Sequence, residues 1–231
     1  MLTKLFTGLI HTLPSQCRVC HSWPAHPVCE DCVGQFAQPH QRCITCALPL
    51  PSGMLRCGAC LKDPPPLDLC LTGVAYAYPW SSLIADFKFH AQSGLVHSLS
   101  TLLKASPWVE PALDAAHLLL PMPLSTSRLA ERGYNQALLL ARALNARKTR
   151  ADILLRMQDT PAQHTLKRTQ RLHVLDHAFA VDPLLAHHLK GACVVLVDDV
   201  MTTGASLHAA ARVLRKAGAH HITGLVFART E

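Results

Sequence analysis

The sequence predicts an α/β fold in which a small cysteine-rich domain precedes a parallel sheet flanked by helices. After residue 70, short apolar runs alternate with longer segments of helical periodicity, an order typical of a parallel sheet with right-handed crossovers. Four Cys-x2-Cys pairs lie between Cys17 and Cys60, where large apolar residues are few. The Pro-rich stretch Lys62–Leu67 separates these two regions and marks the boundary between the two domains.

The chain therefore divides into four predicted parts. Residues 1–16 carry apolar side chains at helical spacing, which predicts an amphipathic helix that packs on its own protein, on a partner or on a membrane surface. Residues 17–60 hold the cysteine pairs, residues 61–69 form a stiff connector, and residues 70–231 form the α/β domain. No apolar run approaches the roughly 18 residues of a membrane span, and no secretory signal is convincing, so we expect a cytoplasmic protein.

The cysteine pairs predict two structural zinc sites. Two Cys-x2-Cys pairs supply the four thiolates of a closed tetrahedral Zn²⁺ site, which leaves no coordination position for a substrate. We expect sequential pairing, although the spacing also allows the first pair to join the third. Disulfides are the alternative, but they require an oxidising compartment. The predicted zinc ligands are Cys17, Cys20, Cys29 and Cys32 in one site, and Cys43, Cys46, Cys57 and Cys60 in the other.

Composition limits the classes of partner. The formal net charge is +7 and the apolar fraction is 49%, whereas aromatic residues make up only 5% of the chain. So few aromatic residues give little support to nucleic-acid binding by base stacking. Between Arg128 and Arg171 the chain has ten Lys and Arg residues and three acids, so positive charge is concentrated there. Such a segment suits a polyanionic ligand such as a pyrophosphate or a nucleic-acid backbone; solvated helix faces are the alternative explanation.

The elements of the α/β domain follow from the apolar pattern. Runs of β-branched and other apolar residues predict strands, and apolar spacings of three and four residues predict helices. The predicted strands are Val74–Tyr78, His117–Leu120, Ile153–Leu155, Val194–Val197 and Ile222–Ala228. The predicted helices are Trp80–His90, Leu95–Lys104, a long helix that begins near Tyr134 and a last helix that ends near Gly218, with a loop bounded by Pro107 and Pro111.

The segment Val194–Ser206 carries the clearest functional signal. After the buried strand come Asp198 and Asp199, at the sheet edge where open α/β sheets bind ligands. A small, hydroxyl-rich turn then leads into a helix, and backbone N–H groups at a helix start bind phosphate. Carboxylates accept hydrogen bonds from the hydroxyls of a ribose. The segment therefore predicts a site for a sugar 5′-phosphate; an ordinary βα unit with acids at the strand end is the alternative.

This arrangement resembles the phosphoribosyl pyrophosphate (PRPP) motif of type I phosphoribosyltransferases. Two further blocks are similar to the competence protein F (ComF) family, which includes GntX-type proteins linked to the use of DNA as a nutrient. They are Pro121–Leu124 with Arg128 and Arg132–Gln136, and Arg156, Thr160, Gln163, Leu166 and Arg171 with Ala178–Phe179. The resemblance covers nearly the whole chain after residue 16. It implies a type I phosphoribosyltransferase-like parallel sheet behind a double zinc ribbon.

The resemblance also implies roles for individual residues. Asp198 and Asp199 would bind the ribose hydroxyls from a solvent-facing crevice, and residues 158–171 would form a loop that closes over the ligand. Mg²⁺ would bridge the diphosphate and the ribose. The implied catalytic residues are Asp198, Asp199, Arg132 and Arg171, although each arginine would equally suit a salt bridge on a helix. Phosphate and pyrophosphate binding would fall to Met201, Thr202, Thr203, Gly204, Ala205 and Ser206, and to Leu124, Ser125 and Arg128 in the loop Pro123–Arg128.

Two functions of different classes follow from this interpretation. A ComF-like protein of DNA uptake or DNA use would bind PRPP or a related ribose 5-phosphate, with single-stranded DNA and a DNA-uptake helicase as candidate partners. The alternative is an active phosphoribosyltransferase of nucleotide metabolism. A transcriptional regulator ranks last, because no helix-turn-helix sequence stands out.

Overall fold

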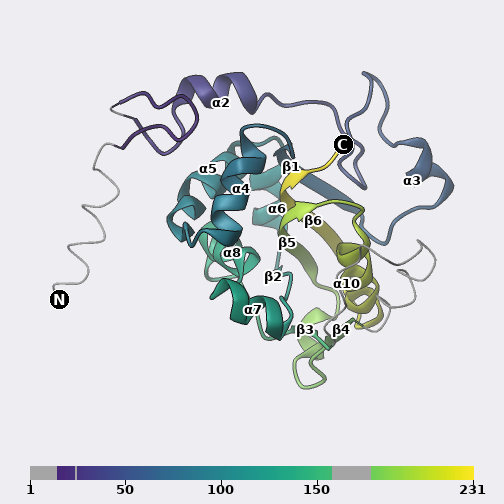
Figure 1. Cartoon of the computed structure of the whole chain (residues 1–231). Helices are drawn as coiled ribbons and strands as arrows, with labels where there is room; N and C mark the ends of the chain where they lie inside the picture. Colours follow the sequence, from purple (N-terminus) through teal and green to yellow (C-terminus); the bar gives the residue numbers. More distant parts are fainter. Residues whose placement is uncertain (1–14, 24, 158–177) are drawn as a thin grey trace. The chain divides into compact units, whose positions relative to one another are not determined.

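The computed structural model describes residues 15–23, 25–157 and 178–231 (Figure 1). Its contacts divide the chain into two compact units, Met1–Gln38 and Pro39–Glu231. The second cysteine module thus shares a compact unit with the sheet. The four-part division of the chain stays a prediction. The helix expected over residues 1–16 lies almost wholly outside the described residues.

The two cysteine modules repeat one local structure. In each, the third cysteine is the N-cap of a short helix, α2 (Glu30–Phe36) in the first module and α3 (Gly58–Lys62) in the second. In each, the residue after the second cysteine is left-handed, with φ of 61° at His21 and 57° at Ala47. The duplicated spacing in the sequence therefore corresponds to a duplicated backbone conformation.

The larger unit is built on a four-stranded parallel sheet with the strand order β1-β6-β5-β2. Its strands are β1 (Leu69–Ala75), β2 (Leu118–Pro121), β5 (Cys193–Met201) and β6 (His221–Arg229). The central strands β5 and β6 are buried along most of their length, because their apolar residues occupy both faces. The predicted α/β class with a parallel sheet is confirmed.

Helix α10 (Ala205–Lys216) covers one face of this sheet (Figure 1). It packs on β5 and β6, which it also connects. Because successive strand residues point to opposite faces, alternate residues of the two strands meet this helix. The buried residues that share a core cluster with α10 include Val194, Leu196, Ile222 and Val226.

The other face is covered by α4 (Trp80–Phe89), α5 (Val96–Ala105) and α8 (Gln136–Asn145). The Trp80 ring meets the Phe227 ring of β6 edge-on, with 5.9 Å between ring centroids. The remaining helical elements of the described ranges are α6 (Val109–Ala115), α7 (Thr126–Arg132) and the 3-10 turns Ser93–Leu95 and Ala186–Leu189. No helix in the described ranges is both long and apolar enough to cross a membrane.

The path of the chain makes the carboxyl ends of the neighbouring strands β2 and β5 a topological switch point. After β2 the chain runs through α7 and α8 to Thr149, which bridges to Leu119 on the side of β2 away from β5. After β5 it runs through α10 to β6, in the opposite direction across the sheet. The segments that follow β2 and β5 therefore diverge, and open α/β sheets bind their ligands in the crevice at such a point.

Three predicted elements differ from the structure. The first strand is β1, Leu69–Ala75, rather than Val74–Tyr78, because this earlier stretch pairs in register with β6. Strand β3 (Leu154–Arg156) pairs antiparallel with β4 (Phe179–Val181) in a separate sheet instead of joining the parallel one. The expected loop between Pro107 and Pro111 contains the start of α6. Proline is tolerated there because the first N–H groups of a helix have no partner within it.

Candidate functional site

The turn after β5 combines exposed hydroxyls with the start of a helix. Thr202 and Thr203 are exposed, and Gly204 is the N-cap of α10 with φ of 79°. A Cβ at Gly204 would lie 2.3 Å from the Cε of Met201 and 2.9 Å from the Nε2 of His208, so the turn requires glycine for both its conformation and its space. Gly204 has no side chain with which to cap the helix. The Ala205 N–H donates to the Oγ1 of Thr203 at 3.3 Å, and the N–H groups that follow it in the first turn of α10 suit an anionic ligand.

Asp198 and Asp199 have different surroundings. Asp199 is only 7% exposed, and its Oδ1 lies 2.8 Å from the Nζ of Lys88 on α4. Asp198 is partly exposed, and its Oδ1 accepts a hydrogen bond from the Asp199 N–H at 2.9 Å. Burial of its carboxyl group and the adjacent Asp199 carboxylate raise the pKa of Asp198 to about 7, against the opposing charges of Lys88 and Arg132. The expectation that both carboxylates face solvent is therefore wrong for Asp199.

Arg132, the last residue of α7, lies beside these acids. Its guanidinium stacks on the Phe89 ring, 5.1 Å from the ring centroid, and donates to the Oε1 of Gln136 at 3.2 Å. Its Nε is buried and has no hydrogen-bond partner in the part of the chain that the structure describes. Because buried donors are almost always satisfied in folded proteins, this N–H fits an anionic ligand at the site.

The loop after β2 is shorter than the sequence predicts. Helix α7 begins at Thr126, so Arg128 belongs to a helix, and its side chain is exposed. Ser125 is buried, and its Oγ caps this helix by accepting a hydrogen bond from the Arg128 N–H at 3.4 Å. The hydroxyl expected to bind pyrophosphate therefore has a structural partner. Leu124 and Ser125 lie three and four residues after the end of β2, in the segment that leaves its carboxyl end.

Each cysteine module brings four sulfur atoms together, within 4.8 Å of one another. Tetrahedral Zn²⁺ with Zn–S bonds of about 2.3 Å separates its sulfurs by about 3.8 Å. The recorded Sγ–Sγ distances of 3.9, 3.5 and 3.7 Å agree with this geometry. Both groups are therefore compatible with zinc, and they follow the sequential order: Cys17, Cys20, Cys29 and Cys32, then Cys43, Cys46, Cys57 and Cys60.

Backbone N–H groups stabilise one thiolate in each module. The N–H of Cys29 donates to the Sγ of Cys17, and the N–H of Cys57 to the Sγ of Cys43, both at 3.4 Å. Burial opposes ionisation of Cys17 and Cys43, but the hydrogen bonds outweigh it and lower the pKa of each thiol to about 6. Because the thiolate is the form that binds metal, these contacts prepare both modules for a cation.

Comparison with known proteins is consistent with this geometry. A phosphoribosyl transferase domain model matches residues 129–230. The chain is 32% identical over 231 residues to the DNA utilization protein YhgH of Escherichia coli strain K12, an alignment that covers 95% of this chain and 99% of that protein. This chain belongs to the ComF/YhgH family. It is also 32% identical over 203 residues to competence protein F of Haemophilus influenzae (84% of this chain, 87% of that protein), and 33% identical over 140 residues to competence protein ComFC of Bacillus subtilis (58% and 53%).

The resemblance to the ComF family read from the sequence motifs is thus confirmed, and the domain match suggests a PRPP-type ligand. The structure brings Asp198, Asp199 and Arg132 together beside the turn Met201–Ser206. Arg171 and the expected closing loop lie outside the described residues.

Sequence reasoning missed one charged residue of this candidate site. Lys88 lies near the end of α4 and pairs with Asp199, which is distant in the sequence. No local motif marks it, since a lysine beside an apolar helix face is ordinary. In the sequence, Lys88 is marked only by its position in the last turn of an apolar helix, which must pack on the sheet.

Proposed function

We propose that this ComF/YhgH-family protein binds PRPP, or a related ribose 5-phosphate, in the crevice at the carboxyl ends of β2 and β5. The observation that carries the proposal is the pair Asp198–Asp199 followed by a left-handed Gly204 at the start of α10. The turn offers hydroxyls and N–H groups to the 5′-phosphate, and the Asp198 carboxylate accepts hydrogen bonds from ribose hydroxyls. The Nε of Arg132, which has no hydrogen-bond partner among the described residues, would donate to the diphosphate.

The donor set also fits Mg²⁺. This ion prefers oxygen ligands, keeps several waters and binds through one or two carboxylates together with substrate phosphates. Asp198 is the residue that would hold it, because Asp199 already has Lys88 as its partner. When bound, Mg²⁺ would neutralise part of the diphosphate charge. A cation beside Asp198 would also oppose the raised pKa of that carboxyl group and favour the carboxylate at neutral pH.

Phosphoribosyl transfer is the second candidate function. In such a reaction the bond between ribose C1 and the pyrophosphate oxygen breaks, and the sugar gains oxocarbenium character. An acceptor nucleophile then bonds to C1 and gives up its proton to solvent, while pyrophosphate leaves with the electron pair of the broken bond. The Arg132 guanidinium is placed to stabilise the negative charge of the leaving pyrophosphate, because stacking on Phe89 orients it before the ligand arrives. Asp198 would hold the ribose during this step.

Use or uptake of DNA is the proposed biological setting. The relatives carry the names DNA utilization protein and competence protein F, and this chain has a formal net charge of +7, which two zinc sites of four thiolates each lower to about +3. A positive net charge supports an additional contact with single-stranded DNA. A DNA-uptake helicase is the proposed protein partner. Binding to labelled single strands at increasing salt tests the nucleic-acid contact, since phosphate contacts weaken steeply with salt.

Calorimetric titration of the zinc-loaded chain with PRPP and Mg²⁺ tests the proposed function. We expect saturable binding that ribose 5-phosphate competes away and that free ribose does not. Release of pyrophosphate with a panel of nucleobases then separates transfer from binding alone. Absence of heat and of competition at millimolar PRPP would overturn the proposal.

A further inference from the structure

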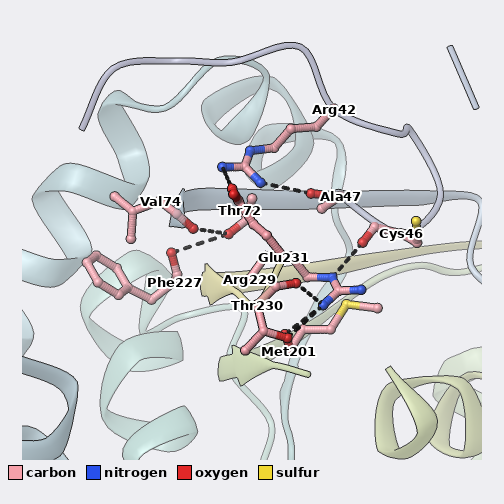
Figure 2. Close-up of polar contacts among 10 residues, drawn as sticks. All are labelled: Arg42, Cys46, Ala47, Thr72, Val74, Met201, Phe227, Arg229, Thr230 and Glu231. Atoms are coloured by element: carbon pink, nitrogen blue, oxygen red, sulfur yellow. Dashed lines mark hydrogen bonds and ion pairs between the residues drawn. The ribbon is translucent and has the colours of Figure 1, made fainter. Parts of the chain in front are cut away.

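A single buried arginine joins the second cysteine module to the phosphate turn. Arg229 ends β6 and is only 6% exposed. Figure 2 shows its guanidinium between the two parts: Nε donates to the carbonyl oxygen of Cys46 at 2.9 Å, and a terminal nitrogen donates to that of Met201 at 3.2 Å. The same nitrogen also donates to the carbonyl oxygen of Thr202. One side chain therefore contacts the backbone of the second cysteine module and the backbone at the start of the turn after β5.

Neighbouring contacts hold both ends of this connection. The N–H of Thr230 donates to the carbonyl oxygen of Met201 at 3.0 Å. Arg42 donates to the carbonyl oxygen of Ala47 at 3.0 Å and forms an ion pair with Glu231 at 3.6 Å (Figure 2). The module is thus fixed to the end of β6, and the end of β6 is fixed to the turn.

The geometry makes these contacts interdependent. A guanidinium is planar and rigid, so the carbonyl that Nε reaches determines where the terminal nitrogens lie. Because Arg229 is only 6% exposed, a donor that loses its carbonyl has little access to water, and unpaired buried donors are costly. The same terminal nitrogen also donates to the carbonyl oxygen of Thr230, which itself bonds to Met201. A displacement of the Cys46 carbonyl therefore disturbs Arg229 together with the contacts that hold the carbonyls of Met201 and Thr202.

We propose that metal binding at the second cysteine module positions the phosphate turn through Arg229 and so tightens the binding of ribose 5-phosphate. This inference rests on the proposed function. Coupling between two binding sites is reciprocal, so ribose 5-phosphate must raise the zinc affinity of the second module by the same factor. The first module belongs to the other compact unit and provides an internal control.

The two modules offer a matched pair of variants. Cys57 and Cys29 are both partly buried cysteines, and each is the N-cap of a short helix. We expect Cys57→Ser to weaken ribose 5-phosphate binding about tenfold by calorimetry, and Cys29→Ser to change it less than about twofold. Arg229→Lys keeps the positive charge but loses the planar fork, and we expect the same loss as for Cys57→Ser.

A zinc measurement decides the question even where a variant does not fold. The Cys29→Ser protein retains only the second module, and its zinc affinity is measured by competition with a colorimetric chelator, with and without ribose 5-phosphate. We expect about tenfold tighter zinc binding in the presence of the ligand. Zinc affinity indifferent to the ligand, or Cys57→Ser binding ribose 5-phosphate as the wild type does, would overturn the coupling. A wild-type protein that does not bind ribose 5-phosphate would overturn the proposed function instead.

Discussion

Replacing Asp198 by Asn is expected to stabilise the folded protein while it abolishes ribose 5-phosphate binding. Burial and the neighbouring Asp199 carboxylate penalise the charged form of Asp198 in the folded state. Asparagine removes this penalty and keeps the Oδ1 atom that accepts the Asp199 N–H at 2.9 Å. It removes the negative charge that Mg²⁺ requires and that binds ribose hydroxyls most strongly.

The pKa shift of Asp198 sets the size of the expected gain in stability. A rise of the Asp198 pKa from 3.8 to about 7 corresponds to at most about 4 kcal/mol of destabilisation above neutral pH. Asp198 is partly exposed, so solvent reduces this to an expected gain of about 1–2 kcal/mol in Asp198→Asn. Between about pH 4 and about pH 7 the folded state binds more protons than the unfolded state, so this group's contribution to stability falls as pH rises. The gain from Asn therefore grows across that window.

Urea unfolding at about pH 5 and about pH 8, with free Zn²⁺ held constant, measures this gain. Asp152→Asn is the control, because its exposed ion pair with Arg150 lowers the Asp152 pKa. A lowered pKa stabilises the fold above the unfolded pKa, so this variant should lose stability, by less than about 0.5 kcal/mol. An equal effect of Asp198→Asn at both pH values, or a loss at pH 8, would refute the reasoning.

Three further predictions follow from the same contacts. Gly204→Ala should lose about 2 kcal/mol of unfolding free energy and most ribose 5-phosphate affinity. The control is Gly191→Ala, which should lose about 1 kcal/mol because Gly191 has φ of 70° but open space where a Cβ would lie. Equal losses in the two variants would contradict the steric argument. Lys88→Met should lose about 3 kcal/mol of unfolding free energy in urea, because Asp199 then stays buried without its partner. The double variant Lys88→Met with Asp199→Leu should recover most of this loss. No recovery would count against a stabilising Lys88–Asp199 ion pair. Chelating zinc should make α2 and α3 sensitive to limited proteolysis, whereas unchanged resistance would rule out a structural metal.

Local patterns predicted the parts of this protein that local chemistry determines. The cysteine spacing predicted both sulfur groups because four thiolates on paired knuckles have few other arrangements. The strand and turn from Val194 to Ser206 were readable because a strand buried on both faces, two acids and a glycine turn follow one another directly.

Contacts between distant segments were not readable from the sequence. The Lys88–Asp199 pair and the Arg229 contacts join residues far apart in the chain, and each lysine or arginine alone is unremarkable in its local context. The β2 loop was predicted too long because the Ser125 hydroxyl caps α7 instead of facing a ligand. Strand β3 was placed in the wrong sheet because an apolar triplet does not specify its pairing partner.

The central claim is that a phosphate monoester binds at the first turn of α10 while Asp198 holds the attached ribose. A crystal structure of the zinc-loaded protein with ribose 5-phosphate tests this claim most directly. We predict phosphate oxygens within hydrogen-bond distance of N–H groups in residues 203–206, and a ribose hydroxyl on the Asp198 carboxylate. A saturated crystal in which the ligand occupies another surface and this turn binds none would contradict the account.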